Sequence, residues 1–315
     1  MNRRFILTAL LFTWFSLCLT ASADAQTKTL TAEDYFRRAG ELRKKDALHS
    51  AIANYTKAIE LNPSFTDAYA DRCSAYLDEQ KTEAALADCD KAIQLNPKMW
   101  TAYYTRGMAY LNSRPFSSNA IQDFSTVISL KADHSEAYYM RAVLYSNLKD
   151  YEKAVLDLTK IIESGFPNLS RYRKGDVFFA RGRSYSYLTK EDLALRDYAQ
   201  ALKLHPGLYD VYDFRADVYL KQKKYDLAIR EYATAIEVLT GKKYFKWGIS
   251  DFYRKRGLVY VSKSQWDLAL ADYTKAIQLA PLRYFNYKER AAIYRALDKA
   301  DLAAKDEEAV RKLGF

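Results

Sequence analysis

The chain contains few residues of the types that usually carry catalysis or bind metal ions. Its three histidines, His49, His134 and His205, are far apart, and none has another His or Cys at a metal-ligand spacing. No glycine-rich phosphate loop, serine nucleophile motif or paired-carboxylate arrangement stands out from the rest of the pattern. We therefore expect a protein with no catalytic residues, no metal site and no cofactor.

Arginine is the charged residue with the most regular spacing. It recurs eight times, usually 34 residues apart, at Arg38, Arg72, Arg106, Arg141, Arg181, Arg215, Arg256 and Arg290. In seven copies an acid follows sixteen or seventeen residues later, at Asp88, Asp123, Asp157, Asp197, Glu231, Asp272 and Asp306; the first copy has Asn54. The matched acids favour a structural ion pair in each unit over a ladder of arginines that holds an anionic ligand.

These arginines belong to a repeated pattern that predicts pairs of amphipathic helices. In the first helix aromatic residues recur seven apart with a small residue between them, as in Tyr212, Ala216 and Tyr219, which places all three on one face. The second helix has alanine followed by a bulky residue, as in Ala228 and Tyr232, and small residues let helix axes approach closely. Proline ends the second helix at Pro63, Pro97, Pro206 and Pro281. A period of this length is typical of a stacked helix–turn–helix solenoid.

In this pattern the chain resembles the tetratricopeptide repeat (TPR) proteins. That family has an aromatic residue at the fourth place of each repeat, a small residue at the eighth, an aromatic at the eleventh, alanine at the twentieth and proline at the thirty-second. Eight units match, starting near residues 32, 66, 100, 135, 175, 209, 250 and 284. All eight have the twentieth-place alanine: Ala51, Ala85, Ala120, Ala154, Ala194, Ala228, Ala269 and Ala303. The resemblance implies an all-α, right-handed superhelical solenoid over residues 32–315.

Residues 1–25 have a different character. A basic start, Arg3 and Arg4, precedes an uncharged apolar run at residues 5–20, and small residues at Ala23 and Ala25 offer cleavage sites. This is the layout of a secretory signal peptide, which a short polar lead at residues 26–31 would follow. The alternative is an uncleaved membrane anchor, but the apolar run is short for a span. We predict the exported bacterial type of TPR protein, periplasmic or secreted, with no transmembrane helix in the mature chain.

Two insertions, at residues 165–174 and 241–248, break the period and hold most of the basic character. Residues 165–190 carry six basic residues and one acid, and residues 241–264 carry seven and one. Outside these segments the chain after the leader has a net charge of about −2. The predicted basic edge consists of Arg171, Arg173, Lys174, Lys242, Lys243 and Lys246. The insertions could equally be ordinary solvated loops.

The resemblance also implies a binding groove, because TPR proteins usually hold extended peptides or partner helices on the concave face formed by the first helices. The groove places that are apolar in this chain are Leu77, Tyr104, Met108, Leu111, Tyr139, Val143 and Phe179. Later units present charged residues instead: Asp213, Asp217, Arg254, Lys288 and Arg295. The Lys and Asn residues with which chaperone-binding TPR domains clamp a terminal carboxylate have no match here. For the apolar residues, packing against the neighbouring repeat is the alternative.

Cys73 and Cys89 are the cysteines that follow the leader, and both fall in the second unit. In the repeat register Cys73 takes the small eighth place and Cys89 the usually bulky twenty-fourth, which face each other across the helix pair. Facing cysteines tend to pair in an oxidising compartment. We therefore predict a disulfide, with two buried free thiols as the alternative.

We expect a non-catalytic scaffold of the cell envelope or exterior that binds an extended segment of a partner protein, of unknown identity, in its groove. The alternative is an adaptor that binds an anionic envelope surface, lipid headgroups or glycan, through the two basic aromatic insertions. Nucleic acid is not an expected partner of an exported chain. Salt distinguishes the two hypotheses, because attraction between exposed charges is screened over about 8 Å at physiological ionic strength.

Overall fold

The computed structural model describes residues 29–113, 118–241 and 245–315. The predicted signal peptide at residues 1–25, most of the polar lead, and Lys242 and Lys243 lie outside the described residues. The chain divides into two compact units, residues 1–113 and residues 114–315.

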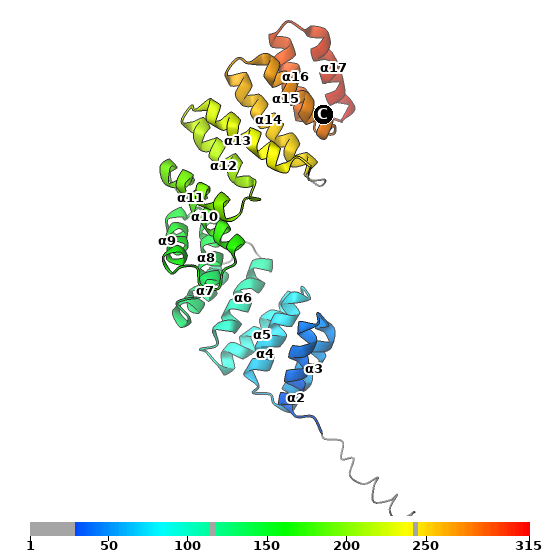
Figure 1. The fold of residues 1–315 in the computed structure, drawn as a ribbon. Helices are drawn as coiled ribbons and strands as arrows, with labels where there is room; N and C mark the ends of the chain where they lie inside the picture. Colours follow the sequence, from blue (N-terminus) through cyan, green and yellow to red (C-terminus); the bar gives the residue numbers. More distant parts are fainter. Residues whose placement is uncertain (1–28, 114–117, 242–244) are drawn as a thin grey trace, which may run out of the picture. The chain divides into compact units, whose positions relative to one another are not determined.

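The first unit contains five described helices, drawn from blue to cyan-green in Figure 1. They are α2 (Ala32–Lys44), α3 (Leu48–Leu61), α4 (Thr66–Asp78), α5 (Thr82–Leu95) and α6 (Trp100–Ser113). The first helix starts where the repeat register predicts, because Thr31 accepts a hydrogen bond from the backbone N–H of Asp34 while the Asp34 carboxylate accepts one from Thr31 N–H. This capping box satisfies two backbone donors that would otherwise lack partners.

The second unit contains eleven described helices, which follow one another from green to red in Figure 1. They are α7 (Ser118–Leu130), α8 (Ser135–Asn147), α9 (Tyr151–Glu163), α10 (Arg171–Tyr187), α11 (Glu191–Leu204), α12 (Asp210–Lys221), α13 (Tyr225–Leu239), α14 (Lys246–Ser262), α15 (Trp266–Leu279), α16 (Tyr284–Ala296) and α17 (Ala300–Lys312). The described residues contain no β-strand. The prediction of an all-α repeat fold is therefore confirmed.

Within each unit the helices pack through small residues on one side and aromatic rings on the other. The twentieth-place alanines are buried, with exposures between 0% and 2%. Four tyrosines of the second helices, Tyr55, Tyr198, Tyr232 and Tyr273, are almost completely buried against them. A buried ring removes a large apolar area from water, so these positions provide much of the hydrophobic stabilisation of each repeat.

Cys73 and Cys89 fill this position in the second repeat. Both side chains are fully buried, and the structure joins them by a disulfide between α4 and α5. Tyr76 and Leu77 pack beside the bridge. The smaller cysteine pair thus occupies the space that an aromatic ring fills in other repeats.

Six of the seven predicted arginine–acid pairs are present in the described residues, and each ties the two helices of its repeat together. In the second repeat Arg72 makes two parallel hydrogen bonds to the Asp88 carboxylate, at 2.6 and 2.7 Å. Its remaining nitrogen donates to Thr56 Oγ1 of the preceding repeat at 2.9 Å. The same two-point pairing joins Arg141 to Asp157, Arg181 to Asp197, Arg256 to Asp272 and Arg290 to Asp306, while Arg215 meets Glu231 at 3.1 Å.

These pairs have an architectural role because both partners are enclosed. The five aspartates have exposures between 5% and 7%. Removing one member of such a buried pair typically costs about 3–5 kcal/mol, because the other charge is left without compensation. Arg106 of α6 donates to Asp90 at 2.6 Å. The predicted pair between Arg106 and Asp123 joins residues of different units and stays a prediction.

The two insertions lengthen helices. The repeat register places the start of the fifth unit near residue 175 and that of the seventh near residue 250, but α10 begins at Arg171 and α14 at Lys246. Both helices have 17 residues, whereas the other first helices have 12 to 14. Part of each insertion is therefore an additional helical turn rather than loop.

Candidate functional site: a groove cavity in the second unit

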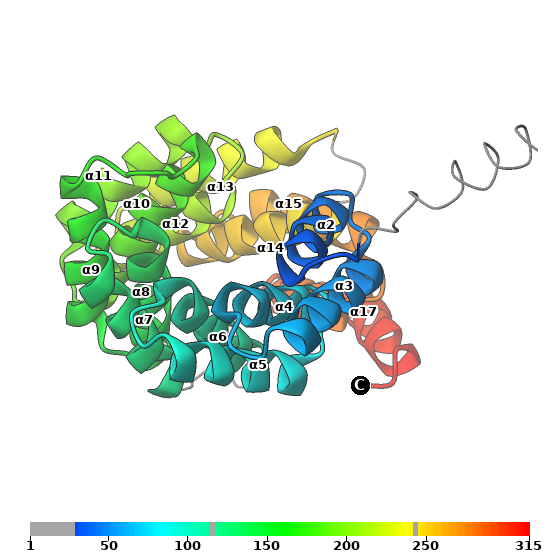
Figure 2. The same ribbon diagram turned by 90° about the horizontal axis from the view of Figure 1, so that it is seen from below.

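The first helix of each repeat lines the inner side of the second unit. Figure 2 shows α8 and α10 on the inside of this unit and α9 and α11 on its outside. This is the location where the repeat register predicts a binding groove.

The structure brings the predicted groove residues Tyr139, Val143 and Phe179 together at a cavity of about 330 Å³. Tyr139 and Val143 come from α8, and Phe179 comes from α10, one repeat later. The remaining lining residues are Ser146, Asn147, Tyr151, Asp176, Ala180, Arg183, Ser184, Tyr187 and Leu208. Ligand pockets commonly measure about 300–1,000 Å³, so this cavity suits one or two side chains of a partner.

One end of the cavity carries a group of ionisable residues around Tyr139. The Arg173 guanidinium lies 4.8 Å from the centre of the Tyr139 ring. It also lies 3.2 Å from the Glu136 carboxylate and 3.6 Å from that of Asp176. His205 Nδ1 is 3.6 Å from the other Asp176 oxygen. Asp176 thus lies between the Arg173 guanidinium and the His205 imidazole at the cavity wall.

Burial raises the pKa of the Tyr139 phenol above its ordinary value, and the Asp176 carboxylate acts in the same direction. The phenol therefore stays protonated at neutral pH and can donate a hydrogen bond to a ligand. With the Asp176 carboxylate as acceptor, this end of the cavity offers both donor and acceptor groups.

The other side of the cavity is aromatic. The rings of Tyr151 and Tyr187 are stacked with centres 4.6 Å apart, and Tyr187 is about half exposed. The exposed Arg183 guanidinium lies 5.7 Å from the Phe179 ring and 5.0 Å from the Phe214 ring. Aromatic rings with a nearby guanidinium favour an amphipathic guest, whose apolar part contacts the rings while its polar end reaches the rim.

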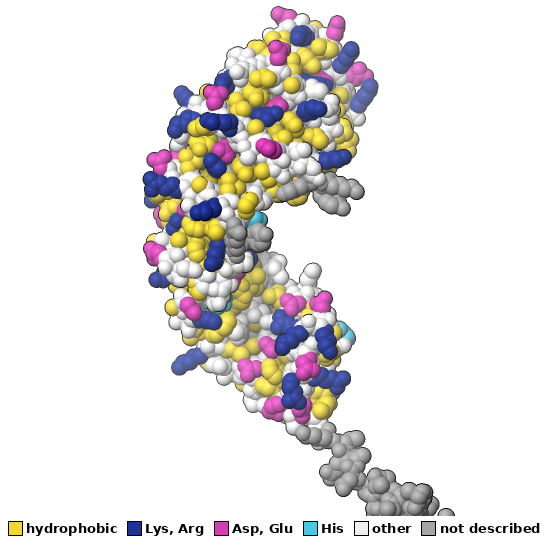
Figure 3. All heavy atoms as spheres, viewed as in Figure 1, with side chains coloured by type: hydrophobic (Ala, Val, Ile, Leu, Met, Phe, Trp, Pro, Cys, Tyr) yellow, Lys and Arg dark blue, Asp and Glu magenta, His cyan; other side chains and the backbone are white. Residues whose placement is uncertain are grey.

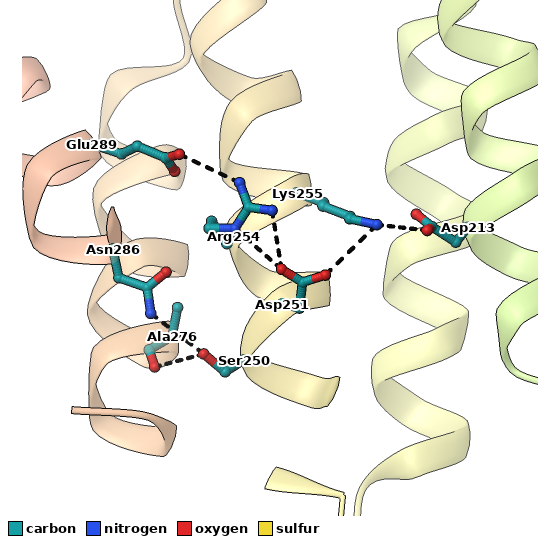
Figure 4. Close-up of polar contacts among 8 residues, drawn as sticks. All are labelled: Asp213, Ser250, Asp251, Arg254, Lys255, Ala276, Asn286 and Glu289. Carbon is teal, nitrogen blue, oxygen red and sulfur yellow. Dashed lines mark hydrogen bonds and ion pairs between the residues drawn. The ribbon is translucent and has the colours of Figure 1, made fainter. Parts of the chain in front are cut away.

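A second group of inner-face residues, on α12, α14 and α16, forms the ion-pair network shown in Figure 4. Lys255 of α14 donates to Asp213 of α12 at 2.5 Å. Arg254 donates to Asp251 on its own helix and to Glu289 of α16, at 3.0 and 3.3 Å. Two of the predicted charged groove residues, Asp213 and Arg254, thus bind charges on neighbouring helices.

The other charged groove residues have different surroundings. Asp217 and Lys288 are exposed, and Arg295 pairs with Glu307 of α17. The groove side of this region thus consists of partly compensated charges, whereas the cavity between α8 and α10 is aromatic.

Below this network lies a buried polar contact. Asn286 is fully buried, and its side-chain amide donates to Ser250 Oγ at 3.4 Å. Ser250 in turn donates to the backbone carbonyl of Ala276 at 2.9 Å. These bonds link α14, α15 and α16 at a place where other repeats have an apolar contact, such as Val177.

Comparison with known proteins agrees with this architecture. Models of the tetratricopeptide repeat match residues 32–65, 66–99, 135–164 and 171–241, more than half of the chain. The chain belongs to the tetratricopeptide repeat family. No curated protein matches its sequence.

Solved TPR structures share the fold. The C-terminal part of a TPR protein from Cytophaga hutchinsonii is 19% identical, with a TM-score of 0.67 over 80% of this chain and 98% of that one. A TPR protein from Parabacteroides merdae is 19% identical, with a TM-score of 0.56 over 87% and 98% of the two chains. YrrB, described as a TPR protein with an unusual peptide-binding site, is 23% identical, with a TM-score of 0.53 over 60% and 93%.

The remaining predicted TPR groove residues lie in the first unit. Leu77 packs beside the disulfide, and Tyr104, Met108 and Leu111 are half-buried on α6. Their participation in a groove stays a prediction. For Leu77 the alternative of packing within the repeats has direct support.

Much of the first predicted basic insertion packs within the TPR fold. Phe166 packs on Phe178 with ring centres 5.6 Å apart, and Leu169 is buried in the same core. Arg173 is held by two carboxylates, as described above, and the Lys174 ammonium lies 5.4 Å from the Phe166 ring. These ion pairs compensate the charge of Arg173 within the fold, and its place in a basic edge stays a prediction. Arg171 begins α10.

The second insertion is divided between core and surface. Phe245 packs against Tyr209 with ring centres 5.2 Å apart, whereas Lys246 is exposed and Trp247 is 62% exposed. Lys246 also borders a cavity of about 530 Å³ with Ile249, Tyr253 and Leu279. This insertion keeps an aromatic and a basic side chain accessible to a ligand.

Several cavity residues were missed by sequence reasoning. Arg183 occupies the same TPR place as Met108 and Val143, so the register alone could have identified it. Tyr151 begins a second helix and Leu208 lies in a turn between repeats. Neither residue lies at a groove place of a first helix, so the repeat register could not have identified them.

Proposed function

We propose that this TPR protein is a non-catalytic scaffold that binds a segment of a partner protein on the inner side of its second unit. The cavity lined by Tyr139, Val143 and Phe179 receives an apolar or aromatic side chain of that segment. The observation that carries this proposal is the meeting of those three residues, from two consecutive repeats, at one cavity.

The composition of the cavity supports a side chain with a polar end. Phe179, Tyr151 and Tyr187 offer aromatic contact area, whereas Asp176 and Arg183 offer charged groups. A few buried aromatic anchors commonly dominate the energy of protein association. Absence of a catalytic role is part of the proposal, and the described residues contain no group of acids, His and Cys suited to a metal ion.

A displayed library of random peptides tests the proposal without knowledge of the partner. We expect the wild-type protein to select a family of sequences that share an aromatic or large apolar residue. Tyr139→Ala combined with Phe179→Ala should weaken binding of the selected peptides by about 2 kcal/mol or more. Leu156→Ala on the outer helix α9, where this side chain is 69% exposed, provides the control.

Two results of that selection contradict the proposal. One is a failure to enrich any sequence family; the other is equal affinity of the selected peptides for the wild type and a double variant that retains its helical circular dichroism.

We further propose that the chain is exported, to the periplasm or beyond the cell. The apolar run and small residues near the start of the sequence support this, as does the proximity of Cys73 and Cys89. In the described residues no helix has the length and hydrophobicity needed to cross a membrane.

The disulfide provides a test of export. Protein taken from its native compartment and alkylated without reduction should have Cys73 and Cys89 linked, because disulfides persist in oxidising compartments. The link closes a loop of 16 residues and should stabilise the repeat by about 3 kcal/mol. Two alkylated thiols in mass spectrometry would contradict both the bridge and this support for export.

A further inference from the structure

The end of the second unit has an exposed apolar strip formed by three separate segments. Trp247 in the first turn of α14 is 62% exposed, Leu282 between α15 and α16 is 73% exposed, and Phe315 at the end of the chain is 68% exposed. Solvent-exposed side chains of this size usually occur singly. Here they are connected by contacts between their neighbours.

Four ring contacts make the strip continuous. The Arg283 guanidinium lies 5.0 Å from the Trp247 ring and 5.4 Å from that of Phe285. Phe285 contacts Tyr284 with ring centres 5.8 Å apart, and Tyr284 stacks on Phe315 at 4.0 Å. The strip thus runs from the second insertion to the C-terminus, and Leu282 adjoins it in sequence.

Three basic side chains near the strip have no ion pair among the described residues. The described residues contain ion pairs for Arg254, Lys255 and Arg256 of α14 but none for Lys246, Lys275 or Arg283. Lys246 and Lys275 border the apolar cavity beside Ile249 and Leu279, and no carboxylate lines that cavity. Figure 3 shows hydrophobic, basic and acidic side chains interspersed over the upper part of the second unit.

We propose that this strip, defined by Trp247, Leu282, Arg283, Tyr284, Phe285 and Phe315, docks the protein on an anionic lipid surface. Trp and Tyr favour the boundary between lipid headgroups and acyl chains. Apolar side chains that insert at this depth combine with basic residues to bind anionic lipid. The cavity beside Lys246 provides an apolar space with cationic residues at its border, as an anionic lipid requires.

A lipid surface fits these observations better than a partner protein. The three most exposed side chains come from the start of α14, the turn before α16 and the segment after α17, so the strip is a row of exposed residues rather than the recessed core of a protein interface. Exposure above 60% at three positions leaves them free to enter a soft interface. This site is separate from the groove cavity and does not depend on the proposed function.

Flotation of the full chain with lipid vesicles tests the proposal, and any contribution of residues 1–25 is common to all samples. Wild-type protein should float with vesicles of phosphatidylcholine and phosphatidylglycerol, and more weakly with phosphatidylcholine alone. We expect Trp247→Ala, Leu282→Ala and Phe315→Ala together to lower the partition constant about tenfold. The matched control changes three exposed leucines elsewhere, Leu61, Leu156 and Leu268, to alanine and should leave it unchanged.

Two further variants keep the test informative if the triple variant misfolds. Lys246→Gln with Arg283→Gln should remove the preference for anionic vesicles while helical content is retained. With Trp14 replaced by Phe in every sample, Trp247→Phe should abolish the vesicle-induced blue shift of tryptophan fluorescence. Equal binding of strip and control variants, or a shift that survives Trp247→Phe, would overturn the proposal. Absence of vesicle binding together with strip-dependent binding to an acidic protein would overturn it in favour of a protein partner.

Discussion

The two insertions occur at the same kind of turn between repeats, and each adds a helical turn before a first helix, but their side chains meet different surroundings. In the insertion before α10, Phe166 and Leu169 join a hydrophobic core and Arg173 binds two carboxylates. In the insertion before α14, Trp247 and Lys246 remain exposed to solvent. Arg173 of the first insertion contacts two residues that line the groove cavity, Tyr139 and Asp176, whereas the second insertion presents a surface.

This difference shows that composition alone does not assign a role to a basic aromatic segment. Both segments are rich in basic and aromatic residues. Their roles differ because different side chains lie next to them in the fold. Glu136 and Asp176 are close to Arg173, while the described residues around Trp247 offer it only the Arg283 guanidinium. Charge that is compensated within the fold is no longer available to a partner.

The largest expected contrast is in stability. Leu169→Ala should lower the free energy of unfolding by about 2–3 kcal/mol, because Leu169 is only 9% exposed and its removal leaves a cavity. Trp247→Ala should change it by less than about 0.5 kcal/mol, because most of that side chain already contacts water. Urea unfolding monitored by circular dichroism measures both. Similar losses of stability in the two variants would contradict the claim that the first insertion packs in the core and the second lies at the surface.

A pair of glycines gives a smaller contrast of opposite sign. A Cβ on Gly175 of α10 would lie 2.8 Å from His205 Cβ and 3.3 Å from the Ala201 carbonyl oxygen, whereas one on Gly248 of α14 would meet nothing within 4 Å. Gly175→Ala should therefore destabilise the protein by about 1–3 kcal/mol. Gly248→Ala should stabilise it by up to about 1 kcal/mol, because alanine favours helix more than glycine does. Equal melting temperatures for the two variants would contradict the close approach of α10 and α11 at Gly175.

The smallest contrast concerns charge. Arg173→Gln should cost about 0.5–1 kcal/mol at low salt, because a half-buried arginine loses two carboxylate partners. Added salt should reduce this cost. Lys246→Gln should leave unfolding unchanged at every salt concentration. A salt-independent cost for Arg173→Gln would indicate that its contact with Tyr139, rather than the ion pairs, stabilises the fold.

Most of the repeat architecture could be predicted from the sequence because it depends on local periodicity. The arginine at the seventh place and its acid sixteen residues later are on facing helices in any such pair, and Arg72 with Asp88 follows this rule. The facing of Cys73 and Cys89 follows from the same register. These contacts depend only on the geometry of one helix pair.

The candidate site was harder to predict because its contacts cross between repeats and depend on the insertions. Tyr139 and Phe179 are separated by an irregular segment, and the register cannot show that Arg173 bends back onto Tyr139. The repeat period could not predict the exposed strip either, because the strip combines a helix start, a turn and Phe315, which follows the last helix. Such contacts need the three-dimensional path of the chain.

The central claim is that a partner segment occupies the groove cavity, and photo-crosslinking in living cells tests it most directly. A photoreactive aromatic residue replaces Val143 in the cavity or Leu156 on the outer helix, and adducts are identified by mass spectrometry. The account predicts a discrete protein adduct from position 143, mapping to one segment of the partner, with none from position 156. The same adducts from both positions, or none from 143 in a correctly folded variant, would contradict it.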